Sequence, residues 1–482
     1  MGGTNPLGAF CPTQKARLKV CCNMKTMTEK PQLFGTDGVR GVAGEPPLDR
    51  DTVFRIGRAL GMVLEKHIPA RPLQVVLGED TRESSAWISR TLAAGLRSSA
   101  VDVAYAGVIT TPGIAFLTRH HGFAGGVMVS ASHNPYQDNG IKILSNSGMK
   151  LSVDLEVEIE VVLKSIPAPE SKALASAELK PIPQLFNDYI EFLAALAPTR
   201  KGLSTFQLVV DCANGSATRV APTLLRRLGI QARILNSSPN GRNINLECGS
   251  LHPQTMAEET RDSAADFGVA FDGDADRAMF ATGDGRALDG DSILYATASF
   301  YKNHGLLKGG AVVGTLMTNL GLQLALALHG ITLKRTPVGD KYVLEEMLQS
   351  GINLGGEPSG HIIFSDISLA GDGMITLLQV LRLLDETGKS LSDLVSPLKQ
   401  FPQIIRNVRV RERLPLESIP EVELALSDFR REVDGRGRVV VRYSGTEPLA
   451  RVMVEAEEAD LVERHAGRIA EAIESTLGWR PS

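Results

Sequence analysis

A strand–helix–strand pattern that occurs three times is the feature that most constrains how this sequence can fold. The copies span residues 73–106, 207–235 and 311–336. In each copy the helix ends at or near a Gly or a pair of Ser, as helix C-termini often do. Such units predict three α/β domains with largely parallel sheets. Right-handed crossovers then place the loops after the first strands at the edge where ligands of such sheets bind.

The rest of the chain predicts a smaller domain of a different kind. Pro-containing segments at 166–183 and 396–402 are suitable boundaries, and the pattern changes after about Phe401. Three strands and two helices are then expected, at residues 408–410, 438–443, 451–455, 419–433 and 460–477. We therefore predict an α/β protein with three similar mixed α/β domains and a smaller C-terminal α+β domain. The predicted segments are a disordered extension (1–30), α/β domains I to III (31–185, 186–285 and 286–400) and an α+β domain IV (401–482).

Composition excludes two classes of partner. The formal net charge is −4 and the pI is about 6.2, so the basic excess of a nucleic-acid-binding protein is absent. The most apolar long window, 309–330, is interrupted by polar residues and does not suit a membrane span. The five Cys lack zinc-ligand spacing, and their odd number favours reduced thiols in a cytoplasmic protein.

Residues 126–142 combine a buried strand with a polar loop. An apolar run leads directly into the loop that holds Ser130, Ser132 and His133, and Lys142 follows shortly after. A Ser at the carboxyl end of a strand is suited to act as a nucleophile or phosphate carrier, with His133 as a neighbouring base. The alternative is a surface turn made of turn-favouring residues.

Three carboxylates alternate in the sequence Asp272-Gly-Asp274-Ala-Asp276-Arg277, directly after an apolar strand. An irregular loop can turn three such oxygens onto one hard cation, for which Mg²⁺ is the natural occupant. A calcium EF-hand is excluded because Arg277 stands where that loop needs Gly, and no helix precedes the motif. The remaining alternative is a solvated acidic turn. Arg277 adds a cation that suits a phosphate near the metal.

Two Gly-rich segments add further polar groups. The segment 34–41 has Gly at positions that let the backbone approach an anion, with Arg40 as the charge. The segment 355–361 presents Glu357 and Ser359, which suit hydrogen bonds to sugar hydroxyls. His361 in the same loop is either a general acid or base or, as we favour from the sequence alone, a structural His.

A second anion site is expected in the last domain. Arg442, Ser444, Gly445 and Thr446 follow an apolar strand and form a phosphate-binding nest that Arg451 can also reach. The Gly-Lys-Ser/Thr ending of a nucleotide P-loop is absent. Two anion sites without a nucleotide signature suit a ligand that carries a phosphate at either end.

The motifs, in this order, resemble those of the α-D-phosphohexomutases. They are Ser-Ala-Ser-His-Asn-Pro (130–135), Asp-Gly-Asp-Ala-Asp-Arg (272–277), Gly-Glu-x-Ser-Gly-His (356–361) and Arg-x-Ser-Gly-Thr-Glu-Pro (442–448). The opening segment 34–41 and the closing segment 451–455 look most like the bacterial phosphoglucosamine mutase branch. The resemblance covers the chain from about Pro31 to the C-terminus.

This resemblance implies four domains around a central cleft and a role for each motif. Ser132 would be the phosphoserine and, with the three Asp of the acidic motif, a ligand of one Mg²⁺. The implied proton-transfer residues are Lys142 and His361, and the implied contacts to the transferring phosphoryl group are Arg40 and Arg277. Sugar hydroxyls would bind Glu357 and Ser359. The non-reacting phosphate would bind Arg442, Ser444, Gly445, Thr446 and Arg451.

The implied activity is interconversion of glucosamine 6-phosphate and glucosamine 1-phosphate, an isomerase reaction of amino-sugar and cell-wall precursor synthesis. A phosphoserine enzyme and a hexosamine or glucose 1,6-bisphosphate would be the intermediates. Pro358 departs from the residues usual in both branches and stiffens the sugar loop, so glucose and mannose phosphates remain alternative substrates. A non-catalytic sugar-phosphate-binding paralogue and a phosphatase are further alternatives. The expected partner is a small sugar phosphate, and the expected state a monomer or homodimer.

Overall fold

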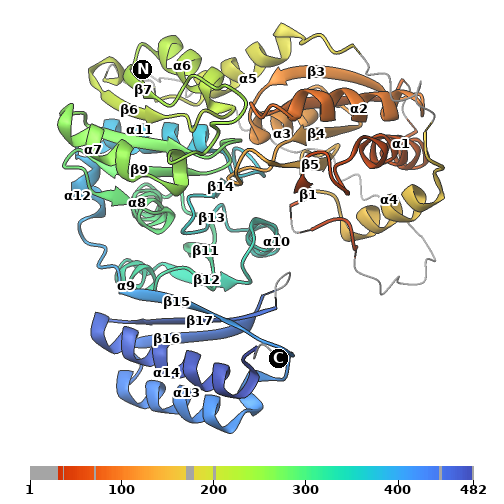
Figure 1. The fold of residues 1–482 in the computed structure, drawn as a ribbon. Coiled ribbons are helices and arrows are strands. Elements are labelled where there is room, and N and C mark those ends of the chain that lie inside the picture. Colours follow the sequence, from red (N-terminus) through yellow and green to blue (C-terminus); the bar gives the residue numbers. More distant parts are fainter. Residues whose placement is uncertain are drawn as a thin grey trace.

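A computed structural model describes residues 31–35, 37–69, 72–169, 178–198, 202–444 and 448–479. The extension predicted for residues 1–30 lies outside this range. Figure 1 shows the described chain as four α/β or α+β units, with the C-terminal unit at the lower end. The predicted fold class is confirmed, because three sheets carry helices in the expected alternation and a smaller sheet follows.

The first domain is built on a five-stranded sheet of order β1-β5-β4-β2-β3. Its elements are β1 (Val39–Val42), α1 (Arg50–His67), β2 (Gln74–Glu79), α2 (Ser85–Arg97), β3 (Asp102–Val108), α3 (Thr111–His120), β4 (Gly125–Val129), β5 (Asp138–Ser145) and α4 (Val153–Ser165). Strands β2, β3 and β4 are parallel, whereas β5 and β1 run antiparallel to their neighbours. Every residue of β4 is buried, as its continuous apolar sequence requires.

The second domain repeats this arrangement with the order β10-β9-β8-β6-β7. Its elements are α5 (Pro183–Ala195), β6 (Gln207–Asp211), α6 (Ala217–Leu228), β7 (Gln231–Leu235), α7 (Gln254–Asp262), β8 (Phe267–Phe271), β9 (Ala278–Thr282) and β10 (Ala287–Leu288). Gly229 closes α6 in the left-handed conformation, with φ of 70°, which other residues adopt only at a cost.

The third domain has the order β12-β11-β13-β14. Its elements are α8 (Gly290–Asn303), β11 (Ala311–Thr315), α9 (Leu320–Leu328), β12 (Thr332–Thr336), α10 (Asp340–Ser350), β13 (Leu354–Gly356), β14 (Ile362–Phe364), α11 (Gly373–Thr387) and α12 (Leu391–Val395). Short 3₁₀ turns lie at Leu203–Thr205, Gly249–Leu251, Lys308–Gly310 and Leu416–Ser418.

The C-terminal domain is an antiparallel sheet of order β15-β17-β16 covered by two helices. Its elements are β15 (Gln403–Arg409), α13 (Pro420–Val433), β16 (Gly437–Tyr443), β17 (Leu449–Ala456) and α14 (Ala459–Leu477). The first strand begins earlier than the sequence pattern indicated. This domain has its own apolar core, whereas one continuous core runs through the first three domains.

The prediction of largely parallel sheets was only partly right, because each of the three α/β sheets contains an antiparallel hairpin. The hairpins are β4–β5, β8–β9 and β13–β14. Their connecting loops are too short for the crossover that parallel strands require. The three predicted site motifs lie in these hairpin loops, at the carboxyl ends of β4, β8 and β13.

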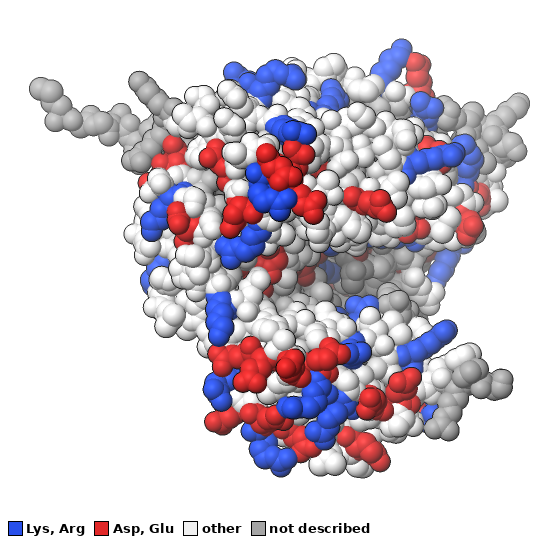
Figure 2. All heavy atoms as spheres, turned by 60° about the vertical axis from the view of Figure 1, so that its left-hand side comes forward, with Lys and Arg blue, Asp and Glu red and all other residues white. Residues whose placement is uncertain are grey.

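Charged side chains of both signs are interspersed over the face shown in Figure 2, which is hollowed between the C-terminal domain and the rest of the molecule. Within the described ranges, none of the helices combines the length and the apolar character needed to cross a membrane.

Candidate active site

Ser132 lies in the β4–β5 loop and points at the acidic motif of the second domain. Its Oγ donates a hydrogen bond to Asp272 Oδ2 at 2.5 Å, and the residue is 2% exposed. Its φ is 53°, a left-handed conformation that is uncommon for a residue with a side chain and is typical of functional sites. Ser130 instead donates from Oγ to Asp80 and accepts from the amide of Ser132 at 2.9 Å. The geometry therefore distinguishes the two Ser residues, and Ser132 is the one beside the carboxylates.

His133 is poorly suited to act as the activating base of Ser132. Its Nδ1 lies 3.3 Å from Ser132 Oγ, which is long for a hydrogen bond between these groups. Burial, together with the nearby guanidinium groups of Arg277 and Arg40, lowers the pKa of His133 to about 4. A neutral imidazole of such low basicity is a weak proton acceptor near neutral pH.

The three carboxylates of the β8–β9 loop form a compact cluster. One oxygen from each of Asp272, Asp274 and Asp276 lies within 4.8 Å of the others. Asp274 Oδ1 and Asp276 Oδ1 are buried and accept no hydrogen bond from the described residues. Burial raises the pKa of Asp272 well above its usual value, and the neighbouring carboxylates of Asp276 and Asp274 add to this effect. Buried carboxylate oxygens without donors fit a hard divalent cation.

Lys142, on β5, neutralises part of this negative charge. Its Nζ lies 2.7 Å from Asp274 Oδ2, 3.0 Å from Asp37 Oδ2 and 3.5 Å from Asp276 Oδ2. Burial alone would lower the pKa of Lys142, but the carboxylates of Asp274 and Asp37 outweigh burial and raise it well above its usual value. Lys142 is therefore a protonated donor in this structure.

Two Arg residues approach the cluster with donors still available. Arg40 lies on β1, so the segment predicted as a loop is partly a strand, and its guanidinium bonds Asp37 at 2.5 Å and Asn134 at 3.3 Å. Arg277 follows the acidic motif, and its amide donates to Asp272 Oδ1 at 3.2 Å. The Nε atoms of Arg40 and Arg277 are buried and have no hydrogen-bond acceptor among the described residues. Such donors suit an anionic group.

The β13–β14 loop brings the predicted sugar-binding residues to the third domain's side of the site. Glu357 is buried, and its Oε1 accepts from the amide of Gly339 at 3.0 Å. The Oγ of Ser359 is buried and makes no hydrogen bond to a described residue. The carbonyl of Pro358 accepts from the amide of Gly290 at 2.9 Å, which ties the loop to the start of α8.

His361 ends this loop as a buried residue between two carboxylates. Its Nδ1 is 3.9 Å from Asp276 Oδ2, and its Nε2 is 3.8 Å from Asp340 Oδ2. Burial lowers the pKa of His361, but the negative charges of Asp276 and Asp340 outweigh burial and raise the pKa to about 9. His361 therefore lies between two carboxylates of the site, and its role stays a prediction.

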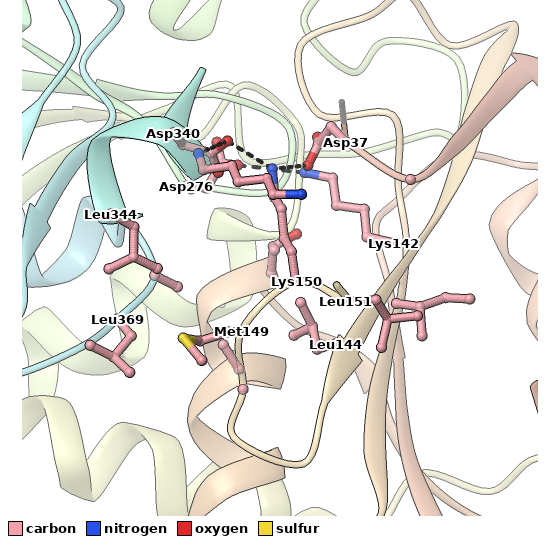
Figure 3. Close-up of a pocket in the computed structure, with 18 of the residues that line it drawn as sticks. Asp37, Lys142, Leu144, Met149, Lys150, Leu151, Asp276, Asp340, Leu344 and Leu369 are labelled. Carbon is pink, nitrogen blue, oxygen red and sulfur yellow. Dashed lines mark hydrogen bonds and ion pairs between the residues drawn. The ribbon is translucent and has the colours of Figure 1, made fainter. Parts of the chain in front are cut away.

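A pocket of about 260 Å³ opens beside these residues, between the first and third domains. Figure 3 shows charged side chains, including Lys142, Lys150 and Asp340, at one end and apolar ones such as Leu144 and Leu369 below them. Lys150 Nζ joins Asp37 at 2.7 Å to Asp340 at 2.8 Å and so links the two domains.

The predicted phosphate-binding group of the C-terminal domain lies in a different part of the fold. Arg442 and Arg451 are direct neighbours on β16 and β17, which Figure 1 places below the other three domains. Burial lowers the pKa of Arg442, and the adjacent charge of Arg451 lowers it further, as expected where an anion would relieve the repulsion. Gly445 and Thr446 lie outside the described residues, and Ser444 is buried at the edge of that segment.

Sequence reasoning missed two residues that hold the Ser132 loop from outside. Arg82, in the loop after β2, donates from Nη2 to the carbonyl of Ser132 at 2.9 Å. Asn245, in the second domain, donates from Nδ2 to the same carbonyl at 2.9 Å. The only signal for Arg82 was its place in a loop at the ligand edge of the sheet, and the sequence held none for Asn245.

Known families account for almost the whole described chain. Models described as phosphoglucomutase/phosphomannomutase alpha/beta/alpha domains I, II and III and C-terminal domain match residues 31–170, 187–285, 289–401 and 406–472. A phosphoglucosamine mutase of Koribacter versatilis is 50% identical over 93% of this chain and 97% of its own length. A phosphoglucosamine mutase of Solibacter usitatus is 47% identical over 92% and 99%.

Solved structures agree in fold. A phosphoglucomutase/phosphomannomutase family protein of Burkholderia thailandensis superposes with a TM-score of 0.75 at 23% identity, covering 92% of this chain and 97% of the other. An Aspergillus fumigatus N-acetylphosphoglucosamine mutase, solved in complex with GlcNAc-6P and magnesium, superposes with a TM-score of 0.65 at 20% identity, covering 92% and 96%. The chain belongs to the phosphoglucomutase/phosphomannomutase family, that is, to the α-D-phosphohexomutases.

Proposed function

We propose that this enzyme is a phosphoglucosamine mutase, which interconverts glucosamine 6-phosphate and glucosamine 1-phosphate. The observation that carries the mechanism is the placement of Ser132 Oγ 2.5 Å from Asp272 Oδ2, beside a cluster of buried carboxylate oxygens. The names of relatives that are 42–50% identical over about nine tenths of the chain favour glucosamine phosphate over glucose or mannose phosphate.

The acidic cluster fits one Mg²⁺, which Asp272, Asp274 and Asp276 would hold together with Ser132 in its phosphorylated form. When bound, the ion would neutralise charge on the transferring phosphoryl group. The two carboxylate oxygens that lack donors, Asp274 Oδ1 and Asp276 Oδ1, are the reason to expect a cation there.

The residues around the cluster perform the transfer. The bond between phosphorus and Ser132 Oγ breaks as a sugar hydroxyl oxygen bonds to phosphorus, so Ser132 gains the proton that the sugar loses. Lys142 and His361 are the proposed proton carriers, because both lie beside the carboxylates that surround Ser132. Arg40 and Arg277 would bind the phosphoryl oxygens with the donors that have no acceptor in the structure.

The reaction needs a ligand that binds in two orientations. A 1,6-bisphosphate forms in the first transfer, turns round, and returns its other phosphate to Ser132. Glu357 and Ser359 would hold sugar hydroxyls, while Arg442, Ser444, Gly445, Thr446 and Arg451 would hold the phosphate that is not reacting.

Two measurements test this function. Intact-mass and peptide mass spectrometry of the purified protein should find one phosphate on Ser132, and Ser132→Ala should abolish turnover while keeping the thermal unfolding midpoint. Comparison of kcat/KM for glucosamine, glucose and mannose 6-phosphates, with a catalytic amount of 1,6-bisphosphate, should rank glucosamine first. Activity of the Ser132→Ala enzyme would refute the mechanism, and a higher kcat/KM for another sugar would refute the substrate assignment.

We further propose that the enzyme is cytoplasmic and acts as a monomer or homodimer. Light scattering of the purified protein will separate these two states.

A further inference from the structure

The main chain at Ser132 is held more firmly than its side chain. The hydroxyl makes its short hydrogen bond to Asp272, and this bond is lost when Oγ carries a phosphate. The carbonyl of Ser132, in contrast, accepts hydrogen bonds from Arg82 and Asn245 that do not involve Oγ. These contacts can therefore persist in both forms of the serine.

Arg82 uses all of its guanidinium donors to shape this loop. Its side chain is fully buried, and Nε donates to Asp80 Oδ2 at 2.8 Å. Its two terminal nitrogens donate to four main-chain carbonyls of one loop, at residues 132, 134, 135 and 138. Five donors thus meet five acceptors, which is the full capacity of an Arg side chain.

Asp80 connects this contact to the serine amide. It accepts from Arg82 and also from Ser130 Oγ at 2.7 Å, and Ser130 Oγ accepts in turn from the amide of Ser132 at 2.9 Å. The amide and the carbonyl of Ser132 are therefore both fixed by one buried network. The left-handed φ of 53° at Ser132, which is uncommon for a residue with a side chain, thus lies within this network.

Asn245 brings the second domain to the same atoms. Its Nδ2 donates to the carbonyl of Ser132 at 2.9 Å and to that of Asn134 at 3.1 Å, and its own amide is bound to the carbonyl of Ala213. The acidic loop belongs to the second domain as well, and Gly273 within it packs against the Ser132 carbonyl. Asn245 thus links the serine loop to the domain that carries the carboxylates.

We propose that Arg82 and Asn245 are positioning residues that hold the main chain of Ser132 from two domains, so that Oγ keeps its alignment with the acidic cluster while it alternates between hydroxyl and phosphate. The inference rests on the proposed phosphoserine mechanism. Neither residue touches the sugar in this scheme, so their loss should affect transfer more than substrate binding.

The test uses Asn245→Gly, because Asn245 has a φ of 57° that Gly adopts without strain. The matched control is Asn243→Gly, in the same loop; among the described residues, its side chain bonds the main chain at residues 238 and 240 and does not reach the serine loop. Asn245→Gly should lower kcat by about 10- to 100-fold with KM for glucosamine 6-phosphate changed by less than about threefold. Asn243→Gly should leave both constants near those of the wild type.

Two further readouts separate positioning from general damage. The ³¹P chemical shift of phosphorylated Ser132 should move in Asn245→Gly and not in Asn243→Gly. The rate at which glucose 1,6-bisphosphate loads Ser132, followed by intact mass, should fall in parallel with kcat. Asn245→Asp keeps the size but replaces the donor with an anion that faces two carbonyls, so it should be slower than Asn245→Gly. Arg82→Lys, with three donors for five acceptors, should also load slowly.

Equal kcat for Asn245→Gly and Asn243→Gly would overturn the inference, as would a fall in kcat that is matched by a rise in KM and a loss of thermal stability. If the wild type does not convert glucosamine 6-phosphate, the proposed function fails, but the loading rate and the ³¹P shift still test the role of Asn245 and Arg82.

Discussion

Substitution of Gly273 by Ala tests how closely the serine loop and the acidic loop must approach. Gly273 lies between Asp272 and Asp274, and a Cβ there would stand 2.4 Å from the carbonyl oxygen of Ser132. Ordinary contact begins at 3.4 Å, so the two main chains would have to separate by about 1 Å. The other near atoms, in Ile244 and Asn245, are at 2.9 and 3.0 Å and leave little room for a sideways shift.

A displacement of this size should be costly to the reaction. Misplacement of reacting groups by about 1 Å costs on the order of 100-fold in rate, or about 3 kcal/mol of activation free energy. We therefore expect Gly273→Ala to lower kcat about 100-fold. Because the acidic loop itself moves, affinity for Mg²⁺ should fall as well, by about tenfold or more.

The assay is steady-state conversion of glucosamine 6-phosphate, with Mg²⁺ affinity measured by calorimetric titration. Gly467→Ala is the control, since a Cβ at that position in α14 meets no described atom within 4 Å apart from its own helix backbone and chain neighbours. It should keep kcat and either leave stability unchanged or raise it by up to about 1 kcal/mol. A folded Gly273→Ala enzyme with kcat within about threefold of the wild type would refute the reasoning, because close approach would then not limit transfer.

Three further outcomes are expected. Removal of divalent metal by EDTA should stop turnover, and addition of Mg²⁺ should restore it. Asp274→Asn should weaken Mg²⁺ binding measured by calorimetry. Activity that survives complete chelation would contradict a metal-dependent transfer. Burial raises the pKa of Asp372 to about 6, despite the hydrogen bond that it accepts from Tyr189. The folded state therefore binds the proton of this carboxyl more tightly than the unfolded state does. The free energy of unfolding should consequently fall as pH rises from about 4 to about 6. Asp372→Asn should remove up to about 3 kcal/mol of this pH dependence in denaturant titrations, and equal pH slopes in both proteins would argue against it. The Glu160 carboxylate accepts hydrogen bonds from three main-chain amides of the segment that leads into the site, including that of Phe34 at 3.0 Å. Glu160→Ala should therefore speed proteolytic cleavage of this segment. An unchanged cleavage rate would count against this anchoring role.

Much of the fold could be predicted because its signals are local. The second unit illustrates this, since the strand–helix–strand unit predicted at 207–235 contains β6, α6 and β7 and ends with β7 at Leu235. The sequence alone shows the signals of such a unit, namely an apolar run, a Gly that ends the helix, and a second apolar run. The antiparallel hairpins were harder to predict, because the sequence of a buried strand is similar whether it pairs in parallel or antiparallel. Only the length of the connection to the next strand distinguishes the two kinds of pairing.

Asp272 and Ser132 could be located in the same way, because each follows a predicted buried strand and must lie near its carboxyl end. What could not be predicted is the set of partners that fix them. Arg82 acts on main-chain carbonyls, which every residue has, so no side chain in the serine loop reveals the contact. Asn245 is 113 residues from Ser132, and only the packing of one domain on another brings them together.

There is a physical reason why the reacting residues could be predicted from the sequence and the residues that hold them in place could not. The reacting groups must change their contacts in each turnover. They are therefore polar side chains with hydrogen-bonding atoms that have no partner among the described residues, as Asp274 Oδ1 and the Nε of Arg277 show. The groups that preserve alignment must not change their contacts, so they are saturated, buried and bound to main chain, as Arg82 is. A saturated residue has no spare donor to mark it as functional, and its importance follows from the atoms it holds in place. Substitutions at such residues should therefore lower the rate of transfer without removing any group that touches the substrate.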